Sequence, residues 1–89
     1  MDILDTNIPP RLRWACRRGM LELDVLLGNF LEEAYLALPS DEQNQFVELL
    51  SCEDQELFNW LTGKEKPTDQ IIENMVEKVR HHAKTRHSR

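Results

Sequence analysis

The sequence predicts an all-α protein, folded as a compact five-helix bundle in a single domain over residues 1–89. The chain is 89 residues long and 40% hydrophobic, which suffices for one small core and one domain. No stretch alternates apolar and polar residues over the roughly four to eight positions typical of a half-buried strand. Apolar residues instead recur at spacings of three and four, and proline and glycine fall between these segments.

The first predicted helix begins at Pro9 and Pro10 and ends at Gly19. Proline suits the first turn because its missing N–H would have no helical partner there. Thr6 or Asn7 can cap nearby N–H groups with a side-chain oxygen. Gly19 suits the left-handed position that commonly follows the last helical residue.

The second predicted helix runs from Met20 to Leu38 and stops at Pro39. Its apolar residues form one stripe on one helix face. These residues are Met20, Leu23, Leu27, Phe30, Ala34 and Ala37. Gly28 lowers the local helix propensity, so we expect it to permit close packing of a neighbouring segment.

The third predicted helix begins at Ser40, where Ser40 and Gln43 match a capping box. In such a box each side chain satisfies a backbone N–H at the other position. The apolar face of this helix is expected to consist of Phe46, Leu49 and Leu50.

Two more helices complete the predicted bundle. The fourth begins near Ser51 and ends at Thr62–Gly63, and the fifth runs from about Thr68 to near Ala83. The fourth contains the apolar residues Leu57, Phe58, Trp60 and Leu61. In the fifth, inward-facing residues are expected at Ile72, Met75, Val76 and Val79. Residues 1–7 and about 84–89 are expected to be flexible, the C-terminal ones because they lack apolar partners.

Charge is distributed very unevenly along this acidic chain, whose net charge is −5. Residues 11–18 carry four arginines and no acid, whereas residues 19–63 carry ten acids and no lysine or arginine. Residues 78–89 carry five basic residues and no acid. Because nucleic-acid binders are usually strongly basic, no nucleic-acid partner is expected, although a regulator that binds through the two basic patches is kept as an alternative.

The N-terminus is acidic and has no apolar run, so neither a secretory signal nor a transit peptide is predicted. No segment approaches the roughly 18 apolar residues of a membrane span, so no transmembrane segment is expected. A cytoplasmic bacterial protein fits these features. Cys16 and Cys52 are expected to be reduced and to pack as small hydrophobes, with a disulfide left open.

The sequence shows no arrangement of side chains suited to catalysis or metal binding. The three histidines lie in the basic tail and lack a metal-ligand spacing: His81, His82 and His87. There is no nucleophile elbow and no glycine-rich phosphate loop. Acids at predicted helix starts are explained by the helix dipole, namely Asp41, Glu42, Glu53 and Asp54. We therefore expect no catalytic residue, no metal and no enzymatic activity.

The junction between the first two predicted helices is the best candidate for a binding surface. Arg17 and Arg18 precede Gly19, and Glu22 and Asp24 follow it, so helix dipoles alone could account for these charges. Dipoles do not explain a tryptophan beside four arginines, although Trp14 could equally belong to the core. Arginine and tryptophan are frequent anchors of protein interfaces. The predicted partner-binding residues are Trp14, Arg17, Arg18, Gly19, Met20, Glu22 and Asp24.

Two motifs resemble the succinate dehydrogenase assembly factor family. Residues 18–22 read Arg-Gly-Met-Leu-Glu and match its R-G-x-x-E signature, preceded by Trp-Ala-Cys-Arg at residues 14–17. Residues 54–61, Asp-Gln-Glu-Leu-Phe-Asn-Trp-Leu, resemble the fourth helix of that family. The resemblance extends from about Ile8 to Val79 and leaves the tail without a counterpart.

The resemblance implies an assembly factor that binds the flavoprotein subunit of succinate dehydrogenase or, in some bacteria, of fumarate reductase. Such a factor promotes covalent attachment of FAD to a histidine of that subunit. The chemistry then takes place on the partner, and no FAD is expected to bind stably to this chain, which lacks a dinucleotide fingerprint. An antitoxin that opposes a membrane-associated toxin is the alternative. The oligomeric state, the particular client, direct FAD contact and the role of the basic tail are left open.

The resemblance also implies roles for individual residues. Arg17 and Arg18 would donate to carboxylates or carbonyls of the partner, and Glu22 would accept hydrogen bonds from it. Gly19 would let two backbones approach closely, where a Cβ would obstruct them.

Overall fold

The computed structural model describes residues 8–87, and within this range it contains five α-helices, a short 3₁₀ turn and no strand. The side chain of His87 also lies outside the description. The elements are α1 Pro10–Ala15, α2 Leu21–Glu33, η2 Tyr35–Ala37, α3 Ser40–Leu50, α4 Asp54–Leu61 and α5 Gln70–His87. The predicted all-α, five-helix fold is therefore confirmed.

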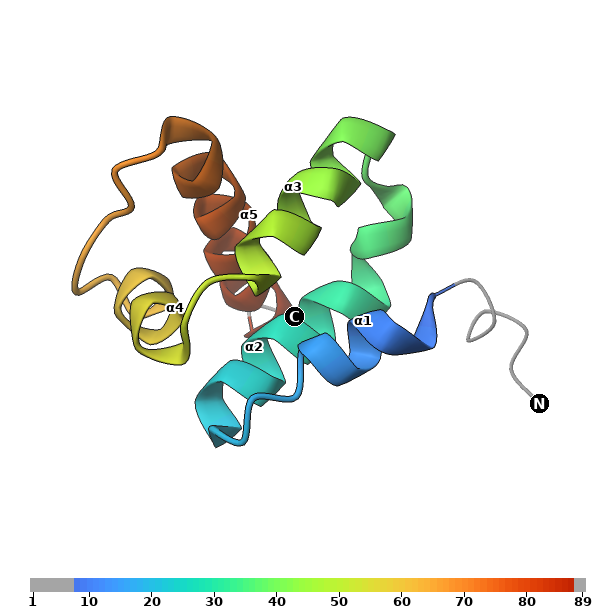
Figure 1. Ribbon diagram of the computed structural model, residues 1–89, viewed down its shortest axis with the longest axis horizontal. Coiled ribbons are helices and arrows are strands. Elements are labelled where there is room, and N and C mark those ends of the chain that lie inside the picture. The colour runs from blue at the N-terminus through green and yellow to red at the C-terminus, as the bar shows by residue number, and fades with distance from the viewer. Residues whose placement is uncertain (1–7, 88–89) are drawn as a thin grey trace.

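Helix α5 is the central element of the bundle. It packs against α2, α3 and α4, while α1 packs on α2. Figure 1 shows α5, drawn in red, surrounded by these three helices, with α1 and α2 together at one side of the molecule. The end of α1 and the start of α2 are thus brought together at an edge of the bundle.

The core consists of the apolar stripes of the helices. The aromatic rings of Phe30, Tyr35 and Phe46 pack together, with centroids 5.2 Å apart for Phe30–Phe46 and 5.8 Å apart for Tyr35–Phe46. Of the apolar residues that the sequence assigned to the helices, those that are buried are Leu23, Leu27, Phe30, Phe46, Leu49, Leu50, Leu57, Leu61, Met75, Val76 and Val79. Those packed against the core but only partly buried are Met20, Ala34, Phe58, Trp60 and Ile72.

Helix α1 is shorter than predicted, because it ends at Ala15 and not at Gly19. The backbone N–H of Cys16 donates to the carbonyl of Leu12, and the chain then leaves the helix. Gly19 does have a positive φ, +80°, but it lies within a connector and not directly after the helix. The predicted caps at Thr6 and Asn7 lie outside the described residues.

The second predicted helix breaks into two elements. Helix α2 ends at Glu33, and η2 follows after Ala34. The break directs Tyr35 into the core, where its carbonyl accepts a hydrogen bond from Gln43 Nε2 at 3.0 Å. Packing of Tyr35 therefore overrides the continuous helical pattern, and Ala37 lies exposed where the stripe predicted an inward residue.

The capping box predicted at Ser40 and Gln43 is wrong. Ser40 forms no capping hydrogen bond with its side chain, because Pro39 occupies the position before α3 and Gln43 is engaged by Tyr35. A capping box occurs instead at the start of α4, where the N–H of Glu53 donates to Glu56 Oε1 at 3.2 Å.

Gly28 does not permit close packing within the chain. A Cβ built at this position meets no atom within 4 Å among those compared. The predicted reason for the glycine is therefore wrong, since the surrounding space is open.

Helix α5 begins at Gln70 and extends to His87, about one turn beyond the predicted end near Ala83. Arg86 explains the extension, because its guanidinium donates to both carboxylate oxygens of Glu33 on α2, at 2.7 and 2.8 Å. Residues 1–7 and 88–89, for which flexibility was predicted, lie outside the described residues.

Candidate docking region

The candidate site is the segment from Trp14 to Val25, which we call the docking region. It comprises the end of α1, a connector over residues 16–20 and the first turn of α2. The N–H of Arg17 donates to the carbonyl of Trp14 at 3.0 Å, and the N–H of Asp24 donates to the carbonyl of Met20 at 2.9 Å. The connector is therefore fixed to a helix at each of its ends.

The side chain of Arg18 holds this connector in place through hydrogen bonds. Its Nε donates to Asp54 Oδ1 at 2.7 Å, and its Nη2 donates to the carbonyl of Cys52 at 2.7 Å. Nη1 donates to the carbonyls of Ala15 and Leu50, each at 2.8 Å. Four of the five guanidinium N–H groups are thus used within the chain, so these donors are not free to reach a partner. A contact between Arg18 and a partner stays a prediction. Its role within the chain, which is to bind the connector to the segment from Leu50 to Asp54, follows from these hydrogen bonds.

Asp24 also acts within the chain. Its Oδ1 accepts a hydrogen bond from the backbone N–H of Arg18 at 2.6 Å, and the residue is half-buried. The carboxylate lies in the first turn of α2, where the helix dipole favours an anion. Asp24 therefore fastens the connector to α2.

Other members of the docking region point into solvent. Trp14 is 76% exposed and so does not belong to the core, and the side chains of Arg17 and Glu22 are exposed as well. Met20 is half-buried and packs against the core. The seven predicted site residues thus divide into an exposed set and an internal set.

Sequence reasoning missed two exposed apolar residues beside Glu22. Leu21 is 79% exposed and Val25 is 49% exposed. Together with Glu22 and Leu26 they line an open hollow of about 400 Å³ on one side of α2. The sequence could have indicated this pair, because Leu21 and Val25 are four positions apart and neither belongs to the buried stripe of α2. Residues four positions apart lie side by side on one helix face, here the outer one. The region therefore offers apolar surface next to a carboxylate.

Gly19 is required by backbone conformation and not by crowding. Its φ of +80° is a region that side chains with a Cβ rarely adopt, while an added Cβ would meet nothing within 4 Å. The space outside Gly19 is therefore open to an approaching molecule.

Neither thiol near the region is suited to nucleophilic chemistry. Both cysteines are free, as predicted. Burial raises the pKa of Cys16 to about 12 and also raises the pKa of Cys52. Both thiols are therefore protonated near neutral pH, whereas a nucleophilic cysteine must be a thiolate.

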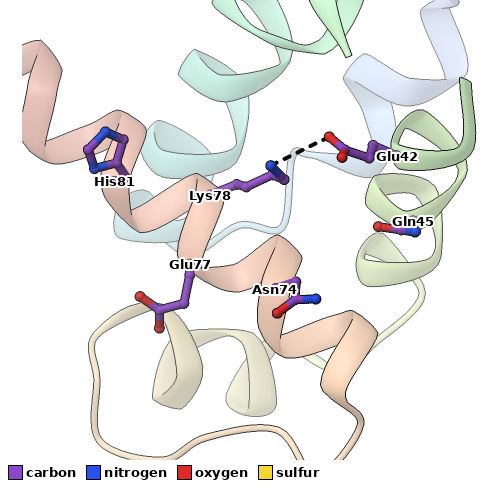
Figure 2. Close-up of a pocket in the computed structure, with 6 residues that line it drawn as sticks. All are labelled: Glu42, Gln45, Asn74, Glu77, Lys78 and His81. Atoms are coloured by element: carbon purple, nitrogen blue, oxygen red, sulfur yellow. Dashed lines mark ion pairs between the residues drawn. The ribbon is translucent and has the colours of Figure 1, made fainter. Parts of the chain in front are cut away.

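A second hollow, of about 490 Å³, lies between α3 and α5; it is wide open and is lined by polar and charged residues. Figure 2 shows its α5 side chains spread along the helix, with Lys78 reaching across to Glu42, 3.6 Å away. The remaining lining residues are Gln45, Asn74, Glu77 and His81. The lining groups do not converge on a common point, so this groove offers no catalytic arrangement.

The described histidine side chains are used as structural partners or lie apart. His82 Nε2 lies 3.0 Å from Glu33 Oε1, and its ring meets Phe30 edge-on at a centroid distance of 5.4 Å. Among the described residues, no group of three His, Cys, Asp or Glu could hold a metal ion. Across the same residues, no helix is both long and apolar enough to span a membrane.

Comparison with known proteins gives a consistent result. Residues 10–83 match the family model described as flavinator of succinate dehydrogenase. The chain is 43% identical over 83 residues to an FAD assembly factor SdhE from a Serratia species, covering 93% of this chain and 94% of that protein. It is 47% identical over 74 residues to FAD assembly factor SdhE of Vibrio vulnificus, covering 83% and 86% of the two chains.

A third relative, FAD assembly factor SdhE of Shewanella oneidensis, is 50% identical over 70 residues, covering 79% of this chain and 85% of its own. The family match over residues 10–83 spans the docking region, the rest of α2, α3, α4 and most of α5. The chain therefore belongs to the family of flavinators of succinate dehydrogenase.

Proposed function

We propose that this chain is an FAD assembly factor that binds the flavoprotein subunit of succinate dehydrogenase and promotes covalent attachment of FAD to it. The observation that carries the proposal is the family match over residues 10–83, with relatives of that name at 43–50% identity. Fumarate reductase is a second client of the same kind, and a cytoplasmic location accords with both.

The docking region supports recognition of a protein surface. Trp14 and Leu21 offer exposed apolar area, and Arg17 and Glu22 offer opposite charges on the two sides of Gly19. Exposed tryptophan and arginine are common anchors of interfaces. Because Arg18 already holds the connector in place, less ordering entropy is lost on binding.

The factor would act by positioning and not by chemistry of its own. It would hold the flavoprotein so that the acceptor histidine and the methyl group of FAD are aligned, and alignment alone can lower a barrier substantially. The protonated thiols and the dispersed polar groups of this chain accord with a factor that is not an enzyme. FAD is then carried by the partner, with no stable binding to this chain.

Flavin fluorescence of the denatured flavoprotein in a gel tests the function, because only covalently bound flavin stays with the polypeptide. We expect a strong signal when this chain is present in the cells and a weak one when it is deleted. Equal signals in the two strains would refute the proposal.

A substitution in the docking region tests the site. Glu22→Ala should reduce both covalent flavin and co-purification with the flavoprotein, while the melting temperature stays nearly constant because Glu22 is exposed. Glu48→Ala is the matched control, since Glu48 is an exposed helical acid on α3. Loss of binding that only follows loss of folding would show that Glu22 is structural.

A further inference from the structure

We propose that Asp54, at the start of α4, is a positioning residue for the docking region and acts through Arg18. The inference rests on the proposed function, because the docking region is where the flavoprotein would bind. Asp54 itself would not touch the partner. It would keep the connector in the conformation that fixes the direction of Arg17 relative to Glu22.

The first step of the argument is the charge balance around Arg18. The guanidinium is largely buried, with its side chain 14% exposed, and three of its hydrogen bonds go to neutral carbonyls. Among the described residues, Asp54 is the one carboxylate that contacts it, at 2.7 Å. A buried cation left with carbonyls alone would be incompletely compensated. Asp54 therefore supplies the countercharge that keeps Arg18 inside.

The second step is geometric. The guanidinium is a rigid plane, so fixing Nε against Asp54 also fixes the directions of Nη1 and Nη2. These atoms reach the carbonyls of Leu50 and Cys52, at the end of α3 and in the loop before α4. Without Asp54, the plane can rotate and the three carbonyl bonds lose their common orientation.

The third step relates the bonds of Arg18 to the orientation of the exposed side chains of Arg17 and Glu22. The side chain of Arg18 is held by the segment from Leu50 to Asp54, and its backbone N–H is held by Asp24 on α2, at 2.6 Å. The next residue is Gly19, the most permissive residue for backbone rotation, and a Cβ added there would meet nothing within 4 Å. Release of Arg18 would therefore let the connector rotate at Gly19 and change the direction of Arg17 relative to Glu22.

Asp54 also has a simpler role that a test must separate from this one. It lies in the first turn of α4, where any acid stabilises the helix dipole. Asp41 provides the matched control, because it lies in the first turn of α3 and its side chain forms no hydrogen bond or ion pair with any described residue. Asp54→Ala and Asp41→Ala therefore remove similar dipole energy, but only the first removes the partner of Arg18.

Hydrogen exchange of the free protein is the first measurement. The amides of Arg18 and Asp24 are hydrogen-bonded in the connector, so their exchange reports its closed state. We expect faster exchange at both amides in Asp54→Ala and wild-type rates in Asp41→Ala. Equal protection in the two variants would overturn the inference without any use of the partner.

Affinity for the purified succinate dehydrogenase flavoprotein is the second measurement, taken at a temperature where every variant is folded. If the closed connector falls to about a tenth of the population, the apparent Kd of Asp54→Ala rises about tenfold. Asp41→Ala should bind as the wild type does. An unchanged Kd for Asp54→Ala, or an equal loss in Asp41→Ala, contradicts a positioning role.

A double substitution identifies the route through Arg18. If Asp54 acts only through Arg18, then Arg18→Ala with Asp54→Ala should bind no more weakly than Arg18→Ala alone. Additive losses would mean that Asp54 acts by another route. Should Arg18→Ala not fold, Arg18→Lys serves the same cycle, because lysine keeps the charge but lacks the planar fork.

The two proposals fail in distinguishable ways. If the wild-type chain binds no flavoprotein and leaves covalent flavin unchanged, the proposed function is wrong, while hydrogen exchange still decides whether Asp54 holds the connector. If the wild type binds and Asp54→Ala binds equally well, only the positioning role is wrong.

Discussion

Gly28→Ala is expected to stabilise the protein, contrary to the usual effect of substitutions in a packed helix. Gly28 lies inside α2 with an ordinary helical φ, and a Cβ added there meets no atom within 4 Å. The substitution therefore removes the entropic cost of glycine without a steric cost, a gain of about 0.5–1 kcal/mol. Urea denaturation followed by circular dichroism measures the change in the free energy of unfolding.

The expected shift in melting temperature follows from the size of the chain. For 89 residues at about 2.1 cal/mol/K each, the unfolding entropy is about 0.19 kcal/mol/K, so Tm should rise by about 3–5 °C. Gly63→Ala is the contrasting control, because Gly63 has a φ of +84° and a Cβ there would lie 2.9 Å from Arg80 Nη2. Alanine in the left-handed region should cost about 1–2 kcal/mol. A Gly28→Ala variant no more stable than wild type would refute the steric reasoning.

Three other predictions concern the core, the ion pairs and the thiols. Phe46→Ala should lower the free energy of unfolding by about 3–5 kcal/mol in urea titrations, because this fully buried ring contacts two other aromatic rings. Arg86 and His82 lower the pKa of Glu33, so the stability that Glu33 contributes is present above its unfolded pKa and is lost as pH falls through the folded pKa. In Glu33→Gln, the free energy of unfolding should therefore fall less steeply as the pH is lowered into the acid range. An unchanged pH dependence would contradict this. Cys16, whose pKa is raised to about 12, should react with iodoacetamide at pH 8 far more slowly in the folded protein than in urea, as mass spectrometry can show.

The core was predictable because it depends on local spacing, whereas several helix ends were not. Residues such as Leu23, Leu27 and Phe30 follow the helical period and are buried as predicted. The break after Glu33 depends on Tyr35 packing in the core and bonding to Gln43, eight positions away, which no local pattern encodes. Tertiary contacts therefore decided where this helix ends.

The candidate site was proposed from the sequence. Which of its residues are exposed and which form bonds within the chain could not be predicted. The sequence grouped Arg17, Arg18 and Glu22 around Gly19, and in the structure Arg17 and Glu22 are exposed while Arg18 is bonded within the chain. Side-chain directions were unpredictable, because the acceptors of Arg18 include the carbonyls of Leu50 and Cys52, which lie 32 and 34 positions further along the chain. Every residue has a backbone carbonyl, so the residue types do not indicate which carbonyls accept these hydrogen bonds. Only the fold reveals that Arg18 faces inward.

The central position of α5 has a consequence for the order in which the protein forms during synthesis. Helices α2, α3 and α4 each pack against a helix that is translated after all of them. Until Met75, Val76 and Val79 have left the ribosome, the apolar faces of α2, α3 and α4 lack the helix that packs against all three of them. The core therefore cannot close until the last helix has been synthesised, and the earlier helices keep part of their apolar surface exposed until then.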